Sequence, residues 1–215
     1  LASTYDFNYP FLAPMNQAIV STPVKVFLCP STPRGDLTYS YTLSGYPGLP
    51  TLTWTAAVSD YGVCAGIFGT GWTTIVGTTA GSDRGGALSF NEKTPLTAIT
   101  DGLSNTILLG EIAARPLLYN NGKQVPGVNN NPGSGWGDPL NGENWFTGSL
   151  FDGTGSTGPC IVNCSNLSGS GWYGFHTGGC NAVMCDGSVR FLTKTGSAKN
   201  IVYMVTRQKG ESISE

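Results

Sequence analysis

The sequence predicts an α+β fold in which antiparallel strands dominate. The first reason is the content of 31 glycines and 13 prolines in 215 residues, which is typical of a chain with many tight turns. The second is an Asp-Gly turn between two apolar runs near the C-terminus, the strongest hairpin signal in the chain. The third is a stretch after this hairpin with apolar side chains near helical spacing. We therefore expect one domain over residues 1–215, a β-rich head with large Gly/Asn-rich loop insertions and a short C-terminal helix.

The composition excludes several classes of function. Charged residues make up 11% of the chain and the formal net charge is −2, so no basic patch for nucleic acid is expected. The apolar runs are far shorter than the roughly 18 residues that a membrane helix needs. Aromatic residues make up 11%, which speaks against a disordered chain. A weakly charged surface rich in Gly, Ser, Thr and Asn suits extracellular and assembling proteins.

The N-terminal quarter predicts one helix and three strands. A short helix is expected over residues 16–21, because Pro23 excludes the helical conformation for the residue before it. Alternating apolar residues predict a strand over Val24–Cys29. An edge strand is expected over Leu37–Leu43, within an otherwise loop-like segment from 34 to 57. Val58–Cys64 is a further strand candidate.

The middle of the chain is less regular. Residues 65–95 are rich in Gly and Thr and give no clear element. The pair Asp101-Gly102 predicts a turn, followed by a strand over residues 105–113. A helix is the alternative there, but Gly110 and Pro116 disfavour it. Residues 120–142 are expected to form one long polar loop, of the kind that is usually functional or flexible.

The last third gives the clearest pattern. Residues 172–176 predict a short strand. Residues 181–184 and 189–192 are expected to pair as a hairpin around Asp186-Gly187. A helix is expected over residues 199–208, which a basic residue and a glycine then end.

His176 is the one histidine of the chain, so any Ser-His-Asp or Cys-His site would have to include it. Asp186 could orient its ring, and Ser188 lies nearby in the sequence. Polar residues on neighbouring strands often lie close together without any chemistry. We therefore expect His176 to bond a backbone carbonyl or Asp186 and to fix the hairpin, and we expect no catalytic residues.

The six cysteines, Cys29, Cys64, Cys160, Cys164, Cys180 and Cys185, favour at least one disulfide and an oxidising compartment. Fifteen pairings are possible, and bridges within 160–164, within 180–185 or between the two segments all remain open. Together with His176, the last four cysteines also offer zinc ligand types. Their spacings are looser than those of zinc knuckles, so we expect disulfides and no metal.

No other motif in the sequence predicts a cofactor. Residues 153–158 match GxGxxG, but they lack the preceding strand and following helix of a dinucleotide site. Five tryptophans could stack on sugars, although a core role is more common. Calcium is a possible ligand of one oxygen-rich loop, which contains Asn129, Asn130, Asn131, Asp138, Asn141 and Glu143.

Four segments resemble one bacterial family. They are Cys29-Pro30-Ser31, Thr100-Asp101-Gly102-Leu103-Ser104-Asn105-Thr106, Gly110-Glu111 and the stretch from Phe175-His176 to Asp186-Gly187 and Phe191. This pattern is similar to the His-x9-Asp-Gly signature of the pilin-like proteins abundant in planctomycetes, the domain of unknown function 1559. The resemblance covers nearly the whole chain.

The resemblance implies an exported, non-enzymatic structural subunit, a pilin- or pseudopilin-like head in an extracellular filament or cell-envelope assembly. Its expected partners are copies of itself or other pilin-like envelope subunits, and not nucleic acid. Members of the family begin with a prepilin-type leader and a long apolar helix. The printed sequence shows neither, so membrane contact is expected only through such an absent helix. An exported glycan- or calcium-binding module is the alternative function.

Overall fold

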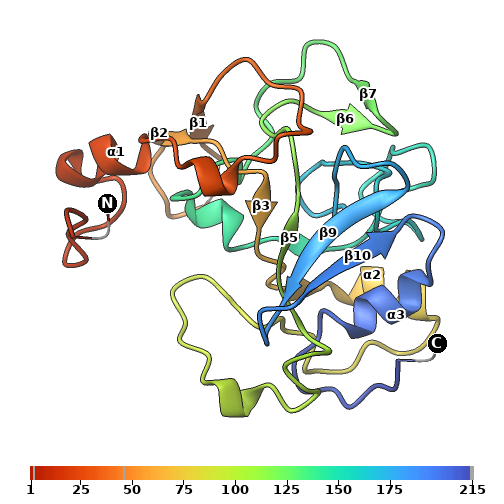
Figure 1. Ribbon diagram of the computed structural model, residues 1–215. Coiled ribbons are helices and arrows are strands. Elements are labelled where there is room, and N and C mark those ends of the chain that lie inside the picture. The colour runs from red at the N-terminus through yellow and green to blue at the C-terminus, as the bar shows by residue number, and fades with distance from the viewer. Residues whose placement is uncertain (2, 46, 214–215) are drawn as a thin grey trace.

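A four-stranded antiparallel sheet lies at the centre of the molecule. The computed structural model describes residues 1, 3–45 and 47–213 (Figure 1). The strand order is β10-β9-β5-β3, with β3 at Tyr61–Gly62, β5 at Ile107–Glu111, β9 at Gly179–Met184 and β10 at Val189–Thr193. All three pairings are antiparallel. The predicted α+β class and the predicted β9–β10 hairpin are therefore confirmed.

Two short helices pack together beside this sheet. They are α2 (Gly69–Val76) and α3 (Ala198–Tyr203). The largest apolar cluster lies between the helices and the sheet, and its largest members are Trp72, Phe146 and Trp172. The predicted C-terminal helix is confirmed but shorter. The chain leaves the helix after Tyr203 because the following residues bond to other segments, as when the Arg207 N–H donates to the Gly85 carbonyl.

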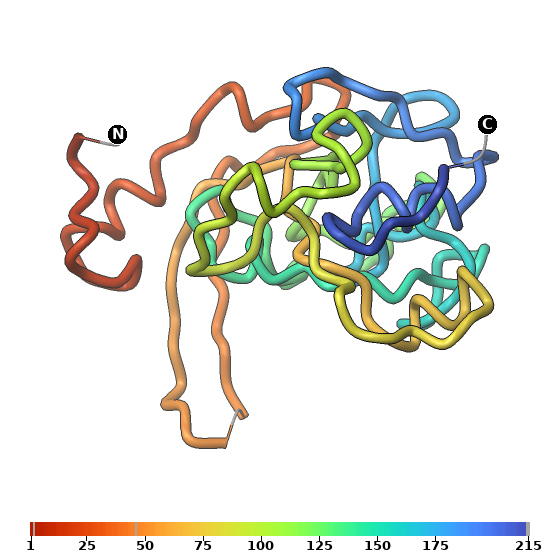
Figure 2. The backbone as a smooth tube through the Cα atoms, turned by 90° about the horizontal axis from the view of Figure 1, so that it is seen from below, coloured from red at the N-terminus to blue at the C-terminus, as the bar shows by residue number. Residues whose placement is uncertain are grey.

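A two-stranded arm projects from this body (Figure 2). It consists of β1 (Thr38–Leu43) and β2 (Leu52–Ala57), paired antiparallel. The predicted edge strand is confirmed as β1, whereas β2 lies in the segment expected to be loop. A second apolar cluster, which includes Tyr39 and Trp54, packs the arm against the N-terminal segment. Helix α1 (Pro14–Val20), close to its predicted position, contacts β2.

The remaining elements are short. Strands β4 (Gly66–Ile67) and β8 (Trp145–Phe146) pair parallel, and β6 (Tyr119–Asn120) pairs antiparallel with β7 (Lys123–Gln124). Single 3-10 turns are η1 (Lys25–Phe27), η2 (Leu96–Ala98) and η3 (Pro139–Asn141). The 120–142 segment is therefore not one long loop, because a tight hairpin and a 3-10 turn divide it.

Three strand predictions fail in whole or in part because tertiary contacts override the local pattern. Val24–Cys29 contains η1 instead of a strand, and the Phe27 carbonyl accepts a hydrogen bond from the Asp60 N–H. In Val58–Cys64 only two residues join the sheet as β3. Residues 172–176 form isolated bridges, not a strand. Conversely, the Gly/Thr-rich segment holds α2, which buries Trp72 and ends at Gly77 with a φ of +81°.

No helix among the described residues is long and apolar enough to span a membrane.

Candidate functional site

Three side chains from distant parts of the sequence meet at one end of the central sheet. They are Cys29, Glu111 and His176, and their candidate ligand atoms all lie within 4.8 Å of one another. The His176 Nε2 atom lies 2.9 Å from Glu111 Oε1 and 3.5 Å from Cys29 Sγ. A thiol, a carboxylate and an imidazole therefore share one small volume.

Asp60 holds the Cys29 loop in place. The Cys29 N–H donates to Asp60 Oδ2 at 2.7 Å. The other carboxylate oxygen accepts the Ala114 N–H at 3.0 Å and a bond from the Arg34 guanidinium. Because Ala114 lies just beyond β5, the fully buried Asp60 ties the Cys29 loop to the end of the strand that carries Glu111.

Glu111 and His176 are positioned by β5 and β9. Glu111 ends β5 and its side chain is fully buried, with Oε2 accepting the Asn181 N–H at 2.6 Å. Gly174 leaves room for this carboxylate, since a Cβ there would lie 2.6 Å from Oε2. His176 bridges to Gly179 just before β9, and its side chain is 29% exposed. The imidazole thus closes the cluster on its solvent side.

Burial and nearby negative charge keep the Cys29 thiol and the Tyr61 phenol protonated. Burial, followed by the carboxylates of Glu111 and Asp60, raises the pKa of the Cys29 thiol, while a backbone hydrogen bond from Ser31 lowers it. Burial, with contributions from Cys29, Glu111 and Asp60, raises the pKa of Tyr61 to about 12. Without an added cation, the thiol and the phenol are therefore neutral near pH 7.

The arrangement differs from a nucleophilic triad. In a triad the base contacts the nucleophile through one ring nitrogen and the orienting carboxylate through the other. Here Nε2 makes both contacts. A reactive cysteine also has a lowered pKa, whereas the pKa of Cys29 is raised. The geometry favours a shared centre of coordination over acid-base catalysis by His176.

His176 does not pair with Asp186 as the sequence suggested. The Asp186 carboxylate accepts the Ser188 N–H and hydroxyl at the tip of the hairpin. The length of β9 separates this turn from His176. Glu111 takes the expected role of Asp186 as the carboxylate partner. In the sequence, Gly110-Glu111 stands out only as part of the family pattern, and no local motif assigns Glu111 a role.

The family segment around Asp101 connects the middle of the chain to its C-terminal end and to the β9–β10 hairpin. The Asp101 carboxylate accepts the backbone N–H groups of Lys209 and Gly210 at 2.8 and 2.9 Å. Asn105 donates to the Asp101 carbonyl, and Gly102 supplies a φ of +99° between them. The hairpin turn docks here too: the Asp186 N–H donates to the carbonyl of Leu103, beside the exposed Ser104. These hydrogen bonds give the residues a structural role, which is to hold the C-terminal segment and the hairpin turn against the Asp101 turn.

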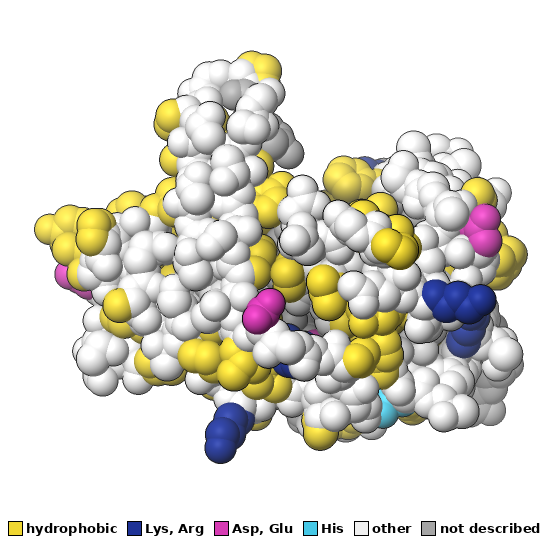
Figure 3. Space-filling model, turned by 90° about the horizontal axis from the view of Figure 1, so that it is seen from above, with side chains coloured by type: hydrophobic (Ala, Val, Ile, Leu, Met, Phe, Trp, Pro, Cys, Tyr) yellow, Lys and Arg dark blue, Asp and Glu magenta, His cyan; other side chains and the backbone are white. Residues whose placement is uncertain are grey.

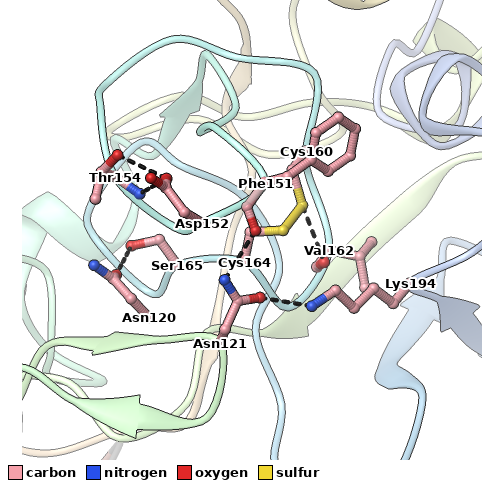
Figure 4. The surroundings of a disulfide bond; sticks show 10 residues. All are labelled: Asn120, Asn121, Phe151, Asp152, Thr154, Cys160, Val162, Cys164, Ser165 and Lys194. Carbon is pink, nitrogen blue, oxygen red and sulfur yellow. Dashed lines mark hydrogen bonds between the residues drawn. A yellow bond between two sulfur atoms is a disulfide. The ribbon is translucent and has the colours of Figure 1, made fainter.

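One disulfide joins Cys160 and Cys164. Figure 4 shows it beside Phe151, whose carbonyl accepts a hydrogen bond from Asn121. The other four cysteines, Cys29, Cys64, Cys180 and Cys185, are free. Cys180 lies near the start of β9 and Cys185 directly after its end, so the proposed local bridge between them is not formed. The zinc ligand set suggested by the cysteine spacing is broken, because two of its members form the disulfide.

The oxygen-rich loop is used mainly for internal hydrogen bonds. Asn131 accepts the Ser168 N–H and donates to the Asn166 carbonyl. Asp138 is bonded to Tyr39 and to the Leu140 N–H. The remaining candidates are dispersed: Asn141 donates to the Tyr61 carbonyl, Glu143 is exposed, and Asn129 and Asn130 line a separate groove. Calcium binding stays a prediction.

The tryptophans mostly fill the interior. Trp54, Trp72 and Trp172 are buried, whereas Trp136 and Trp145 are half-buried. Sugar stacking on the buried three would require the core to open, which leaves two candidates for the glycan-binding alternative.

Comparison with known protein families identifies a match over most of the chain. The family model described as protein of unknown function (DUF1559) matches residues 1–197. No curated protein and no solved structure matches significantly. The segments Cys29-Pro30-Ser31, Gly110-Glu111 and Phe175-His176, separate in the sequence, supply the three side chains of the cluster. Since the model spans most of the 215 residues, the chain belongs to the DUF1559 family of unknown function.

Proposed function

We propose that this protein is a non-enzymatic structural subunit, a pilin- or pseudopilin-like head that packs into an extracellular filament or cell-envelope assembly of a bacterium. Its partners would be copies of itself or other pilin-like subunits. The observation that carries this proposal is an apolar groove without charged side chains along the N-terminal segment. The Cys160–Cys164 disulfide supports export, because disulfides persist in oxidising compartments.

The groove has a volume of about 460 Å³ and no charged side chain in its lining. Phe7 in its wall is 81% exposed. The lining residues come from the N-terminal segment and one later loop, namely Leu1, Tyr5, Phe7, Ile19, Val20, Val24, Phe27, Trp136 and Gly137. An exposed apolar groove supports an interaction site, because exposed apolar surface is often functional.

A second apolar surface lies on another part of the molecule. Strand β10 is an edge of the central sheet, and its Val189 and Phe191 are exposed. Figures 1 and 2 show the N-terminal segment at one side and β10 towards the other. In Figure 3 apolar side chains are visible on a surface with few charges. Contact between two different surfaces is head-to-tail, and repeated head-to-tail contact produces rings or filaments.

Sedimentation velocity over a concentration series tests this assembly. Phe7→Asp should block the groove and Val189→Asp should block the β10 edge. We expect each variant alone to weaken self-association at least about tenfold, which corresponds to about 1.4 kcal/mol. A mixture of the two should form dimers that grow no further, because each variant keeps one intact surface.

The control is Lys123→Asp, on the exposed strand β7, which is part of neither the groove lining nor β10. It should associate like the wild type. A wild-type chain that stays monomeric up to millimolar concentration, and is also absent from isolated envelope or filament material, would contradict the proposal.

A further inference from the structure

We propose that Cys29, Glu111 and His176 bind one divalent transition-metal ion of the zinc class. This site goes beyond the structural function and replaces the sequence-based expectation that the chain holds no metal. The donor set is the first argument. Thiolate sulfur, imidazole nitrogen and carboxylate oxygen are the three ligand types that Zn²⁺ takes in proteins, and calcium or magnesium would not take the sulfur.

The distances between the donor atoms fit a common centre. For usual zinc bond lengths and tetrahedral angles, sulfur and nitrogen ligands lie about 3.6 Å apart, and nitrogen and oxygen ligands about 3.4 Å apart. The separation from Cys29 Sγ to His176 Nε2 is 3.5 Å. The separation from Nε2 to Glu111 Oε1 is 2.9 Å. The Cys29 sulfur and the Glu111 carboxylate oxygen lie within 4.8 Å of each other, against about 3.6 Å for a sulfur and an oxygen bound to one tetrahedral zinc ion. Side-chain movements of up to about 1 Å would therefore complete the geometry.

The direction of the imidazole is the second argument. Nε2 is the atom that faces both the thiol and the carboxylate. One N–H can donate to only one of them well, so a hydrogen-bond network leaves the other contact poorly satisfied. A cation between the three atoms would satisfy all of them together, with Nε2 as an unprotonated ligand.

Charge is the third argument. Glu111 is fully buried, and its one ion pair among the described residues is with His176. The Arg34 guanidinium pairs with Asp60 instead. A buried carboxylate requires a compensating charge. A divalent cation would compensate Glu111 and the Cys29 thiolate that forms on binding, with the thiol proton released to solvent.

The surrounding contacts already orient the ligands. The Asn181 N–H holds Glu111 Oε2, which leaves Oε1 directed at the cluster. Asp60 and the Ser31 backbone hold Cys29 and its sulfur. Such outer contacts are common around metal ligands and tune their affinity.

The site is accessible, and its coordination would be incomplete. His176 is 29% exposed, so an ion can enter past the imidazole. Three protein ligands leave a fourth position for water. The ion would join segments that are up to 147 residues apart, and it should therefore stabilise the fold.

Cobalt titration of the purified full chain, without reductant and under nitrogen, tests the site. We expect one Co²⁺ per chain, with the near-ultraviolet absorption of a thiolate-cobalt bond, and displacement by Zn²⁺. Cys29→Ser should remove this absorption and weaken binding by 10-fold or more. Cys185→Ser is the control, because Cys185 is a free and partly exposed thiol outside the cluster, and it should bind like the wild type.

Two further readouts do not depend on a variant that folds. The chain has one histidine, so nitrogen-15 NMR of the imidazole reports directly on this site. Zinc should shift the Nε2 resonance at one equivalent. Zinc at a hundredfold excess over its Kd should also raise the Tm by about 5–10 °C. Absence of an imidazole shift at stoichiometric zinc, or equal cobalt binding by Cys29→Ser, would overturn the proposal.

Discussion

At the scale of single residues, Gly110 shows how the family pattern serves packing. A Cβ at this position would lie 2.5 Å from Cε3 of Trp172, whose side chain is fully buried. The indole therefore packs directly on the β5 backbone, next to Glu111. Glycine within a strand often marks such a close approach.

Gly110→Ala should consequently destabilise the protein by about 1–3 kcal/mol, because the indole must move within a packed core. Urea unfolding measures the change. Gly35→Ala is the control, since a Cβ there meets nothing within 4 Å, and its effect should stay within about 0.5 kcal/mol. Equal stability of the two variants would contradict the packing of Trp172 on Gly110.

The raised pKa of the buried Asp138 carboxyl predicts that the free energy of unfolding depends on pH. Burial raises its pKa to about 7, although the backbone groups of Leu140, Gly133 and Ser134 act in the opposite direction. The folded state therefore binds this proton more tightly than the unfolded state does. Stability from this carboxyl is fully present below about pH 4 and is lost as the pH rises through about 7.

The size of this effect is bounded by the shift from 3.8 to about 7, which corresponds to at most about 4 kcal/mol. Asp138→Asn should reduce the slope of unfolding free energy against pH between 4 and 7. Denaturant unfolding at several pH values gives both slopes. Parallel curves for variant and wild type would show that Asp138 is ionised in the fold.

At the scale of elements, the Asp101 turn is expected to hold the C-terminal segment. Its carboxylate accepts two backbone N–H groups, from Lys209 and Gly210. Asp101→Ala should release both and cost about 1–3 kcal/mol. Hydrogen exchange should then accelerate at residues 207–210 while β5 stays protected. Asp101→Asn keeps one carbonyl oxygen, so its exchange rates at these residues should lie between those of the wild type and of Asp101→Ala. Unchanged exchange in Asp101→Ala would contradict this role.

Local signals explain which elements could be predicted. The β9–β10 hairpin follows from its Asp-Gly turn, and α3 follows from its apolar spacing, because both form largely from neighbouring residues. Val24–Cys29 alternates like a strand, yet long-range bonds to Asp60 fold it into a turn. Helix α2 has two glycines and no clear period, so burial of Trp72 supplies what propensity lacks.

At the scale of the whole molecule, the candidate site could be predicted only in its parts. The sequence indicated His176 and the cysteines as candidates. It predicted Asp186 as the partner of His176, and it grouped His176 with the four cysteines between 160 and 185. The true neighbours, Glu111 and Cys29, lie 65 and 147 residues away. Only the pairing of β5 with β9 and the Asp60 contacts bring them together. The one sequence signal for this site is that Cys29, Glu111 and His176 each lie in a segment of the family pattern.

As a whole, the chain is proposed to be a repeated subunit of an envelope or filament assembly. Cryo-electron microscopy of native, unfractionated source material tests it most directly. We expect copies of this head at a regular spacing, with the Phe7 groove of one copy against the β10 edge of the next. Finding the chain only as dispersed monomers, with both apolar surfaces open to solvent, would contradict it.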